Sequence, residues 1–158
     1  MYPDSYDYNP FYPKQGDFEL VQKDENSGYG IVSHRSFNKG DLVAVIHGEI
    51  IPDIRQHSLQ IEPGVHLYDT HFSGYFLHSC SPNVHLDMKN MRVHAVRNIK
   101  PGDYILMDYA QTEDVLYRQF PCSCGSRNCR GWITGRKETI DESDLLYQQF
   151  FQNQVVAV

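Results

Sequence analysis

The stretch Leu77-His78-Ser79-Cys80-Ser81-Pro82-Asn83 carries one of the four cysteines, and it lies well upstream of the other three, Cys122, Cys124 and Cys129. Two thiols one residue apart, as in Cys122-Ser123-Cys124, would close a strained ring, so a disulfide is not expected there. The C-x-C-x4-C spacing offers three thiolates, and Cys80 would complete the four that a structural zinc ion takes. The alternative is four ordinary reduced cysteines.

The whole chain has the size and composition of one globular domain. It has 158 residues, 41% of them hydrophobic, and its formal charge of -6 argues against a surface that follows nucleic acid phosphates. No apolar run is long enough for a membrane helix, and the first residues lack the pattern of a secretion signal. We expect an intracellular protein, cytoplasmic or, in a eukaryote, nuclear, with no nucleic acid or membrane partner.

The apolar residues fall in short runs between turn signals, which predicts a mostly β fold. The turns include Asn38-Lys39-Gly40-Asp41 and Lys100-Pro101-Gly102-Asp103, in which we expect glycine at positive φ. A helical pattern is clear only near the end of the chain, with Asp141 or Ser143 as its N-cap and an apolar face that would cover the sheet. The expected strands are 18–21, 28–32, 42–51, 65–68, 91–99 and 104–107.

Three segments, taken in this order, resemble a SET domain, the fold of protein-lysine methyltransferases. The segment Ser27-Gly28-Tyr29-Gly30-Ile31 resembles the G-x-G that opens the family pattern, and residues 77–83 resemble its N-H-S-C-x-P-N signature. Residues 102–109, ending in Asp108-Tyr109, resemble G-E-E-L-x-x-D-Y, and residues 122–131 resemble the post-SET C-x-C-G-x3-C-R-G tail. The first motif alone is weak evidence, whereas the ordered combination is specific.

The resemblance implies a mostly β, SET-like fold of several short β-sheets with a pseudoknot-like threaded segment. It also implies a zinc-bound post-SET tail, in which the signature cysteine Cys80 joins Cys122, Cys124 and Cys129, and a C-terminal helix. The expected division is an N-terminal arm over 1–16, lying on the surface or disordered, a SET-like domain over 17–120, a post-SET zinc segment over 121–136 and a C-terminal helix segment over 137–158.

The activity implied by the resemblance is methyl transfer from S-adenosylmethionine to a deprotonated lysine of a protein or peptide. A lysine side chain has a pKa near 10.4, so holding it neutral at pH 7 costs about 4.6 kcal/mol. The site must therefore lower that pKa by burial and by the nearby sulfonium charge. An aromatic channel would do this and would also bind the amine by cation–π contact.

The resemblance assigns roles to individual residues. Tyr109 matches the catalytic tyrosine, with a tyrosine of the core as its alternative. The substrate channel is expected from Tyr68, Tyr75 and Met107, although plain packing explains the first two equally well. The zinc would fix the tail over the site and so couple metal loss to loss of a lid. The implied cofactor contacts are Gly28, Tyr29, Gly30, Leu77, His78 and Trp132, with a simple turn or core packing as the alternatives.

The chain departs from the family pattern at several positions. Leu77 stands in place of Asn, Gly74 in place of the usual Arg, and Met107 in place of the aromatic residue that helps to set the number of methyl groups added. The tyrosine that the family places ahead of G-E is also replaced, by Ile46. The first two changes favour an alternative function, a catalytically weakened SET-like module that binds a peptide or partner without turnover.

A third interpretation comes from His85-Leu86-Asp87 together with His94, which imitates the two-histidine, one-carboxylate site of an iron oxygenase. Such a spacing arises readily by chance among eight histidines. The sequence leaves open the identity of the substrate, the number of methyl groups added and the oligomeric state.

Overall fold

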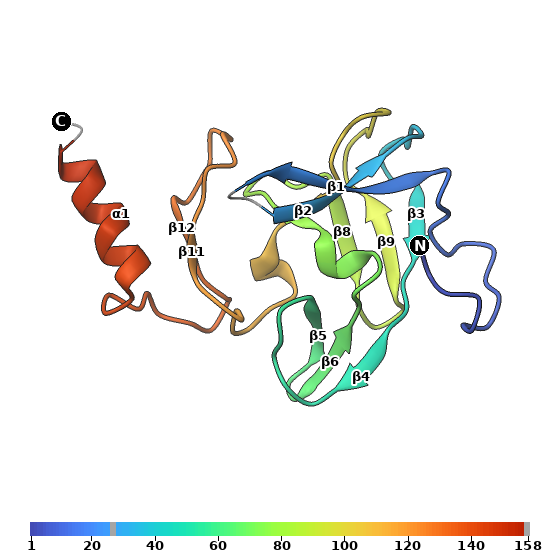
Figure 1. The fold of residues 1–158 in the computed structure, drawn as a ribbon, viewed down its shortest axis with the longest axis horizontal. Coiled ribbons are helices and arrows are strands. Elements are labelled where there is room, and N and C mark those ends of the chain that lie inside the picture. The colour runs from blue at the N-terminus through green and yellow to red at the C-terminus, as the bar shows by residue number, and fades with distance from the viewer. Residues whose placement is uncertain (26–27, 157–158) are drawn as a thin grey trace.

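The computed structural model of the protein describes residues 1–25 and 28–156. Ser27 of the predicted glycine turn and residues 157 and 158 of the C-terminal segment therefore lie outside the described residues. Within the described part, short strands form small two- and three-stranded sheets, and the α-helix lies near the C-terminus (Figure 1). The mostly β character predicted from the sequence is confirmed.

The bounds of the elements show how short they are. The 3₁₀ helices are η1 (Ser73–Tyr75) and η2 (Tyr109–Gln111), and the α-helix is α1 (Leu145–Val156). The sheets have the strand orders β1-β2, β3-β9-β8, β4-β6-β5, β10-β7 and β11-β12. The strands are β1 (Phe18–Asp24), β2 (Gly28–Ser33), β3 (Leu42–Val45), β4 (Glu49–Ile51), β5 (Ser58–Glu62), β6 (Val65–Tyr68), β7 (Leu77–His78), β8 (Val84–Asp87), β9 (Arg92–Ala95), β10 (Leu106–Met107), β11 (Phe120–Pro121) and β12 (Trp132–Ile133).

The main apolar core lies between these sheets, and a smaller cluster formed by Cys80, Leu116 and Ile133 lies at the tail. The rings of Phe72 and Phe76, on either side of η1, meet edge to face with their centroids 5.0 Å apart, and Phe18 meets Phe72 in the same way at 4.9 Å. Burial of such large side chains is the main driving force for folding. The segment that leads into the signature is therefore anchored by its own phenylalanines. The other fully buried apolar side chains are Ile31, Leu67, Val84, Val93, Ile99, Ile105, Met107 and Ile133.

A parallel strand pair joins the signature at residues 77–83 to the motif at residues 102–109. Leu77 and His78 of β7 pair with Leu106 and Met107 of β10, whereas the other strand pairs are antiparallel. Asn83 holds this crossing with its side-chain amide: its Nδ2 donates to the Tyr104 carbonyl at 2.8 Å, and its Oδ1 accepts the Leu106 N–H at 2.8 Å. Residues far apart in the sequence are thereby held side by side.

The two predicted tight turns are confirmed. Gly40 and Gly102 both have φ of +95°, a backbone conformation that residues other than glycine rarely adopt. In each turn an aspartate accepts a backbone N–H, from Asn38 to Asp41 at 2.7 Å and from Lys100 to Asp103 at 2.9 Å.

The predicted strand 42–51 is instead two strands, β3 and β4, separated at residues 46–48. At Gly48 a Cβ atom would lie 2.4 Å from the Tyr68 carbonyl oxygen, so the backbones approach there too closely for an ordinary residue. Strands β5 and β8 were not predicted, because Ser58–Glu62 and Val84–Asp87 are short and partly polar.

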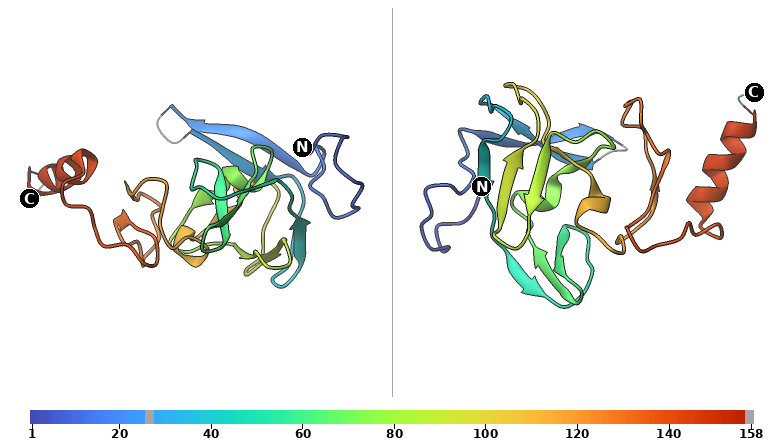
Figure 2. Two further views of the ribbon diagram at one scale, coloured as in Figure 1. Left: turned by 90° about the horizontal axis from the view of Figure 1, so that it is seen from below. Right: turned by 180° about the vertical axis from the view of Figure 1, so that it is seen from behind.

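The tail and the helix lie beside the body of the domain, with α1 at the far end (Figures 1 and 2). The N-cap of α1 is Asp144, whose Oδ1 accepts the N–H groups of Leu146 at 2.7 Å and Tyr147 at 3.2 Å. The prediction of Asp141 or Ser143 was wrong, since Asp141 accepts both the N–H and the hydroxyl of Ser143 instead. The helix packs against β11 and β12.

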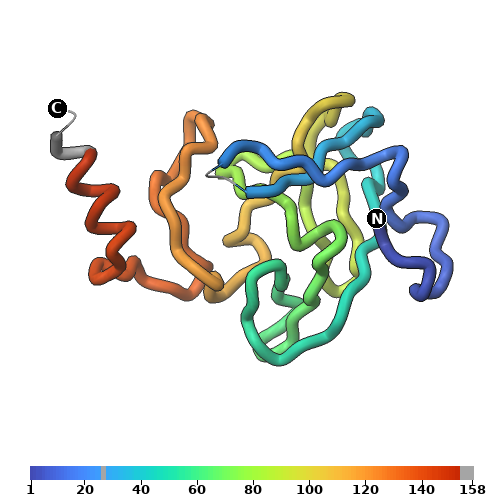
Figure 3. Tube along the Cα trace, in the orientation of Figure 1, coloured from blue at the N-terminus to red at the C-terminus, as the bar shows by residue number. Residues whose placement is uncertain are grey.

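The N-terminal arm lies beside the body (Figure 3) and contacts it through hydrogen bonds and through rings, such as that of Tyr6 stacked on His47 at 4.3 Å. The Tyr2 hydroxyl donates to Oδ2 of buried Asp69 at 2.7 Å and accepts the His47 N–H at 3.0 Å. Further along, the Phe11 carbonyl accepts the Val45 N–H at 2.8 Å. Burial, with the charge of Asp69 acting in the same direction, raises the pKa of Tyr2, so this hydroxyl stays protonated. No helix within residues 1–25 and 28–156 has the length and apolarity needed to cross a membrane.

Candidate active site

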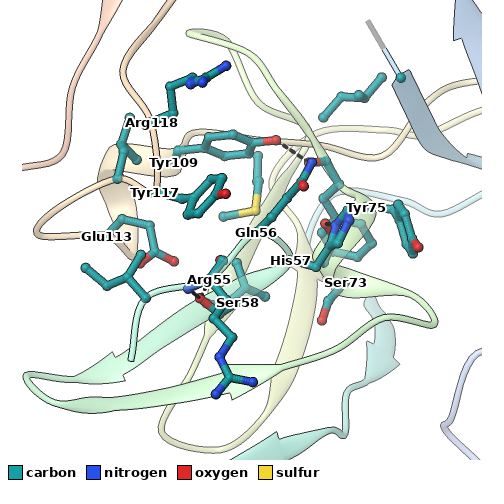
Figure 4. Close-up of a pocket in the computed structure, with 18 of the residues that line it drawn as sticks. Arg55, Gln56, His57, Ser58, Ser73, Tyr75, Tyr109, Glu113, Tyr117 and Arg118 are labelled. Atoms are coloured by element: carbon teal, nitrogen blue, oxygen red, sulfur yellow. Dashed lines mark hydrogen bonds between the residues drawn. The ribbon is translucent and has the colours of Figure 1, made fainter. Parts of the chain in front are cut away.

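A cavity of about 730 Å³ opens between the sheets and the tail (Figure 4). The figure shows Tyr109, Tyr117 and Glu113 on one side, facing Gln56 and His57 on the other. The lining residues come from the start of β2, from the loop before β5, from η1 and β7, from β10 and η2, and from the loop up to β11. They include the predicted site residues Gly28, Tyr29, Tyr75, Leu77, Met107 and Tyr109.

Tyr109 has a fixed orientation at the wall of this cavity. Its hydroxyl donates to the Phe76 carbonyl at 2.7 Å, and its ring meets the rings of His78 and Phe120 edge to face, at 5.1 and 5.8 Å. Burial raises the pKa of Tyr109, and the charge of Glu113 adds to the effect. The phenol is therefore protonated at neutral pH and can orient a group in the cavity.

His78 lies directly behind Tyr109, with its side chain 3% exposed. Burial lowers the pKa of His78 to about 4 despite the opposing charge of Asp108, so the ring is neutral at physiological pH. Its Nδ1 accepts the Tyr109 N–H at 3.3 Å, which leaves the proton on Nε2, 3.5 Å from the Cys80 sulfur. The ring thus connects the backbone of Tyr109 to the cysteine cluster.

The four cysteines come together as the sequence predicted. Their Sγ atoms all lie within 4.8 Å of one another, and Cys80 and Cys122 are 4.0 Å apart. Tetrahedral Zn–S bonds of about 2.3 Å place the sulfurs roughly 3.8 Å apart, so the group can hold a zinc ion. At Cys124 burial opposes ionisation, but hydrogen bonds from Ser126, whose hydroxyl lies at 3.0 Å, together with those from Cys80 and Cys122, lower the pKa of this thiol to about 5.

The cysteine cluster is also the only such group of His, Cys, Asp or Glu side chains within the described residues. The iron-site interpretation of His85, Asp87 and His94 is therefore not supported. Asp87 instead closes a turn: its carboxylate accepts the N–H of Asn90 at 3.1 Å and the Asn90 side-chain amide at 2.7 Å.

An ion pair fastens the tail to the residue before Tyr109. Both terminal nitrogens of Arg130 donate to the Asp108 carboxylate, at 2.6 and 2.8 Å, and the Arg130 N–H lies 3.4 Å from the Cys80 sulfur. Burial acts to raise the pKa of Asp108, but the hydrogen bonds from Arg130 and the Ala110 N–H, together with the Arg130 charge, lower it. Such two-pronged pairs are geometrically specific, so the tail has one docking position.

Leu77 lies against the glycine motif. A Cβ atom at Gly30 would lie 2.7 Å from Leu77 Cδ1 and 3.0 Å from the Tyr104 ring, so the apolar Leu77 uses the space that glycine leaves free. His78 and Tyr104 line a second cavity of about 390 Å³, together with Lys23. Of the residues that the resemblance assigns to the cofactor, Gly28, Tyr29 and Leu77 line the large cavity and His78 lines the second. Gly30 and Trp132 line neither of the two.

No side chain fits at position 74. A Cβ atom on Gly74 would lie 2.0 Å from the Asp69 carbonyl oxygen and 2.6 Å from that of His57. His57 has φ of +70°, its Nδ1 bonds the Gly74 carbonyl at 2.8 Å, and its ring lies 4.4 Å from that of Tyr75. The loop that contains His57 therefore fills the space that a side chain at position 74 would need.

Two other predicted site residues lie elsewhere. Tyr68 is not among the residues that line the large cavity, and its ring lies 5.7 Å from the Arg55 guanidinium. Trp132 is 7% exposed and packs between the tail and α1, with its ring 5.0 Å from that of Tyr147. Their assigned roles stay predictions.

Sequence reasoning missed several lining residues, among them Glu113, Tyr117 and Phe120. Glu113 is four residues after Tyr109, and its N–H donates to the Tyr109 carbonyl at 2.9 Å, as in a helical turn. That spacing was the available signal, but the turn itself was not predicted.

Comparison with known proteins identifies the fold. Residues 28–110 match the SET domain, and this match covers more than half of the chain, which therefore belongs to the SET-domain family. "Methyltransferase flvH" of Aspergillus flavus is 35% identical over 83 residues, which is 51% of this chain and 47% of that protein. "Histone-lysine N-methyltransferase ASHR3" of Arabidopsis thaliana is 29% identical over 162 residues, 86% of this chain and 32% of that protein. The chain thus spans less than half the length of either relative.

Solved structures agree on the fold. The crystal structure of KRYPTONITE in complex with mCHG DNA and SAH has a TM-score of 0.60 and 24% identity, covering 75% of this chain and 29% of that one. The methyltransferase domain of human histone-lysine N-methyltransferase SETMAR has a TM-score of 0.58 and 16% identity, covering 77% and 59%. The SET-like fold expected from the motifs is confirmed.

Proposed function

We propose that this domain is an S-adenosylmethionine-dependent protein-lysine N-methyltransferase. The observation that carries the proposal is the protonated Tyr109 phenol, held by the Phe76 carbonyl in a cavity that also reaches the turn at Gly28 and Tyr29. Membership of the SET-domain family and the printed activities of the relatives support it. The weakened binding module finds no such support among the relatives.

The residues present fit the cofactor. S-adenosylmethionine supplies an electrophilic methyl group on a sulfonium, and a cavity of about 730 Å³ lies in the size range of sites for such ligands. Leu77 offers no hydrogen bond, so recognition at that point rests on backbone groups and apolar contact. The residues that would hold the cofactor are Gly28, Tyr29, Gly30, Leu77 and His78, with Trp132 as the proposed cover from the tail.

The substrate side of the cavity suits a lysine side chain. Tyr75, Tyr109, Tyr117 and Met107 line the cavity, so an amine there would lie among aromatic and apolar surfaces that exclude water. Desolvation lowers the pKa of an amine, and the aromatic faces attract its methylated, charged product. The net charge of -6 favours a basic partner. We therefore propose a lysine-bearing protein or peptide as the substrate, with Tyr68 as a more distant channel residue.

Two expectations about partners and location remain predictions. Several relatives are named as histone H3 methyltransferases, which supports a nuclear target for a chain of this family. Because one structural neighbour was crystallised with DNA, the expected absence of a nucleic acid partner is not confirmed.

The domain division is likewise a proposal: an arm over 1–16, a SET-like domain over 17–120, a post-SET zinc segment over 121–136 and a C-terminal helix segment over 137–158. The hydrogen bonds from Tyr2 to Asp69 and from Arg130 to Asp108 support treating the arm and the tail as attachments to one body. The zinc ion proposed for the tail would hold its segments together.

The test is transfer of a labelled methyl group from S-adenosylmethionine to histones or a cell extract by zinc-loaded protein. The Tyr109→Phe variant should bind the cofactor normally in calorimetry yet lose at least about a hundredfold in turnover, because the orienting hydroxyl is gone. Unchanged turnover in this variant would remove the role given to Tyr109. Zinc-loaded wild type that binds no cofactor would instead identify a non-catalytic module.

A further inference from the structure

Glu113 places a carboxyl group in the same cavity as Tyr109. Its residue is 6% exposed, and it is the only carboxylate among the described residues that line the cavity. Because the Glu113 N–H donates to the Tyr109 carbonyl, the two residues are one helical turn apart and their side chains lie on the same side. Figure 4 shows the Glu113 carboxyl pointing into the cavity beside Tyr117.

The two oxygens of this carboxyl have different surroundings. Oε1 accepts the Gln60 N–H at 2.8 Å and lies 3.5 Å from the Thr112 hydroxyl. Oε2 has no hydrogen-bond partner among the described residues. It is not fully buried either, because the only fully buried side-chain N or O atom without a partner among these residues is His66 Nδ1. Oε2 is therefore open to the cavity and to whatever enters it.

No positive charge within the described residues pairs with Glu113. Arg136, the nearest candidate, is taken up by the Asp114 carboxylate at 2.9 Å. Burial raises the pKa of Glu113 to about 7, although the Gln60 N–H, the Thr112 hydroxyl and the charge of Arg136 oppose it. The other charged or titratable side chains that line the cavity, besides Tyr109, are Arg55, His57, Arg118, Tyr75, Tyr29 and Tyr117.

We propose that Glu113 Oε2 accepts the proton of the substrate lysine ammonium before methyl transfer. One N–H bond of the ammonium breaks and its electron pair stays on nitrogen, while an O–H bond forms on Oε2. The neutral amine then has the lone pair that methyl transfer needs, and Glu113 returns the proton to water between turnovers. This inference rests on the proposed function and assigns the step that prepares the nucleophile.

The Tyr109 phenol and the two arginines of the cavity are less suited to the step. The Tyr109 phenol is already protonated, and its hydrogen is committed to the Phe76 carbonyl. The guanidinium groups of Arg55 and Arg118 cannot accept a proton. A carboxyl that ionises near neutral pH both takes up and releases a proton readily, which is what a general base requires.

The test compares Glu113→Gln with wild type, using a lysine peptide and S-adenosylmethionine between pH 6 and 9.5. Glutamine keeps an acceptor for the Gln60 N–H but cannot take the proton. The matched control is Glu138→Gln, because the Glu138 carboxylate accepts the N–H groups of Gly135 at 2.6 Å and Leu116 at 3.2 Å and does not line the cavity.

The wild type should show kcat/KM rising to a plateau above an apparent pKa near 7, since only the ionised carboxyl is a base. In Glu113→Gln, kcat should fall about a hundredfold or more, and the rise of kcat/KM around pH 7 should disappear, while calorimetry still shows cofactor binding. Glu138→Gln should keep the wild-type kcat and the rise of kcat/KM around pH 7.

Three results are decisive against the proposal. Glu113→Gln with wild-type kcat and an unchanged pH profile overturns it. So does a wild-type kcat/KM that keeps rising tenfold per pH unit beyond pH 8, because the amine would then lose its proton in solution. A wild type that transfers no methyl group at any pH overturns the proposed function as well, which separates that failure from the first two.

Discussion

At the scale of single residues, Gly74 explains a departure from the family pattern. The carbonyl oxygens of Asp69 and His57 lie where a Cβ atom would stand, so the arginine that the family pattern has at this position finds no room in this fold. The same loop holds His57 at positive φ with its ring against that of Tyr75. Glycine at position 74 and this placement of the loop therefore depend on each other.

Gly74→Ala should destabilise the protein by about 1 to 3 kcal/mol or more, because the added methyl group must displace backbone atoms. The matched control is Gly16→Ala, since a Cβ atom there meets nothing within 4 Å. Chemical denaturation followed by circular dichroism measures both. Equal stability of the two variants would show that the loop adjusts without cost.

Glu113 also gives a prediction about stability. A carboxyl whose pKa rises from 4.5 to about 7 on folding contributes stability that is full below pH 4.5 and is lost as the pH rises through 7. Glutamine does not titrate, so Glu113→Gln does not lose this stability. The free energy of unfolding of the variant relative to wild type should therefore be higher at pH 8 than at pH 4 by about 3 kcal/mol. Denaturation of both proteins across this range measures the difference, and parallel curves would contradict it.

At the scale of elements, the N-terminal arm is attached through Tyr2. Its hydroxyl is one of several donors to the Asp69 carboxylate, which also accepts the N–H groups of His71, Phe72 and Ser73. Asp69 in turn holds the start of η1, the element that leads to the signature. The arm thus supports the cavity indirectly.

Tyr2→Phe should cost about 1.5 to 3 kcal/mol, because a buried carboxylate loses a hydrogen bond and the His47 N–H loses its acceptor. Tyr8→Phe is the control, since Tyr8 is 87% exposed. Denaturant midpoints compare the two. A Tyr2→Phe protein as stable as the control would mean that the arm only lies on the surface.

The elements that carried a motif were predictable, whereas those placed by packing were not. The turns at Gly40 and Gly102 follow from local φ requirements, and the cysteine cluster follows from ligand chemistry. Strands β5 and β8 have no strong local pattern, because each is short and partly polar, although each pairs as a hairpin with the strand that follows it. Glu113 was missed for a different reason, since its importance depends on a cavity that only the assembled fold creates.

At the scale of the whole molecule, the cysteine cluster links the tail to the body. Cys80 belongs to the signature, the other three cysteines belong to the tail, and Arg130 bridges from the tail to Asp108. Four thiolates brought together without a cation would repel one another, so docking of the tail and metal binding are coupled.

Chelation should release one zinc ion per chain and loosen the tail while leaving the sheets of the body folded. Trp132, the single tryptophan, is buried under α1, so its emission should shift to the red as the tail separates. Atomic emission gives the metal content, and circular dichroism is the control for the body. Readdition of zinc should restore the spectrum, and unaltered Trp132 emission in metal-free protein would contradict the coupling.

The parallel pairing of β7 with β10 affects how the protein is made. Residues 77–78 cannot pair until residues 106–107 have left the ribosome. The cluster around Cys80 cannot form until Cys122, Cys124 and Cys129 have been made as well. Until then the segment that begins at Leu77 lacks both its strand partner and the cysteines that complete its cluster. A truncated product ending before Asp108 should therefore be cleaved by proteases faster than the full chain.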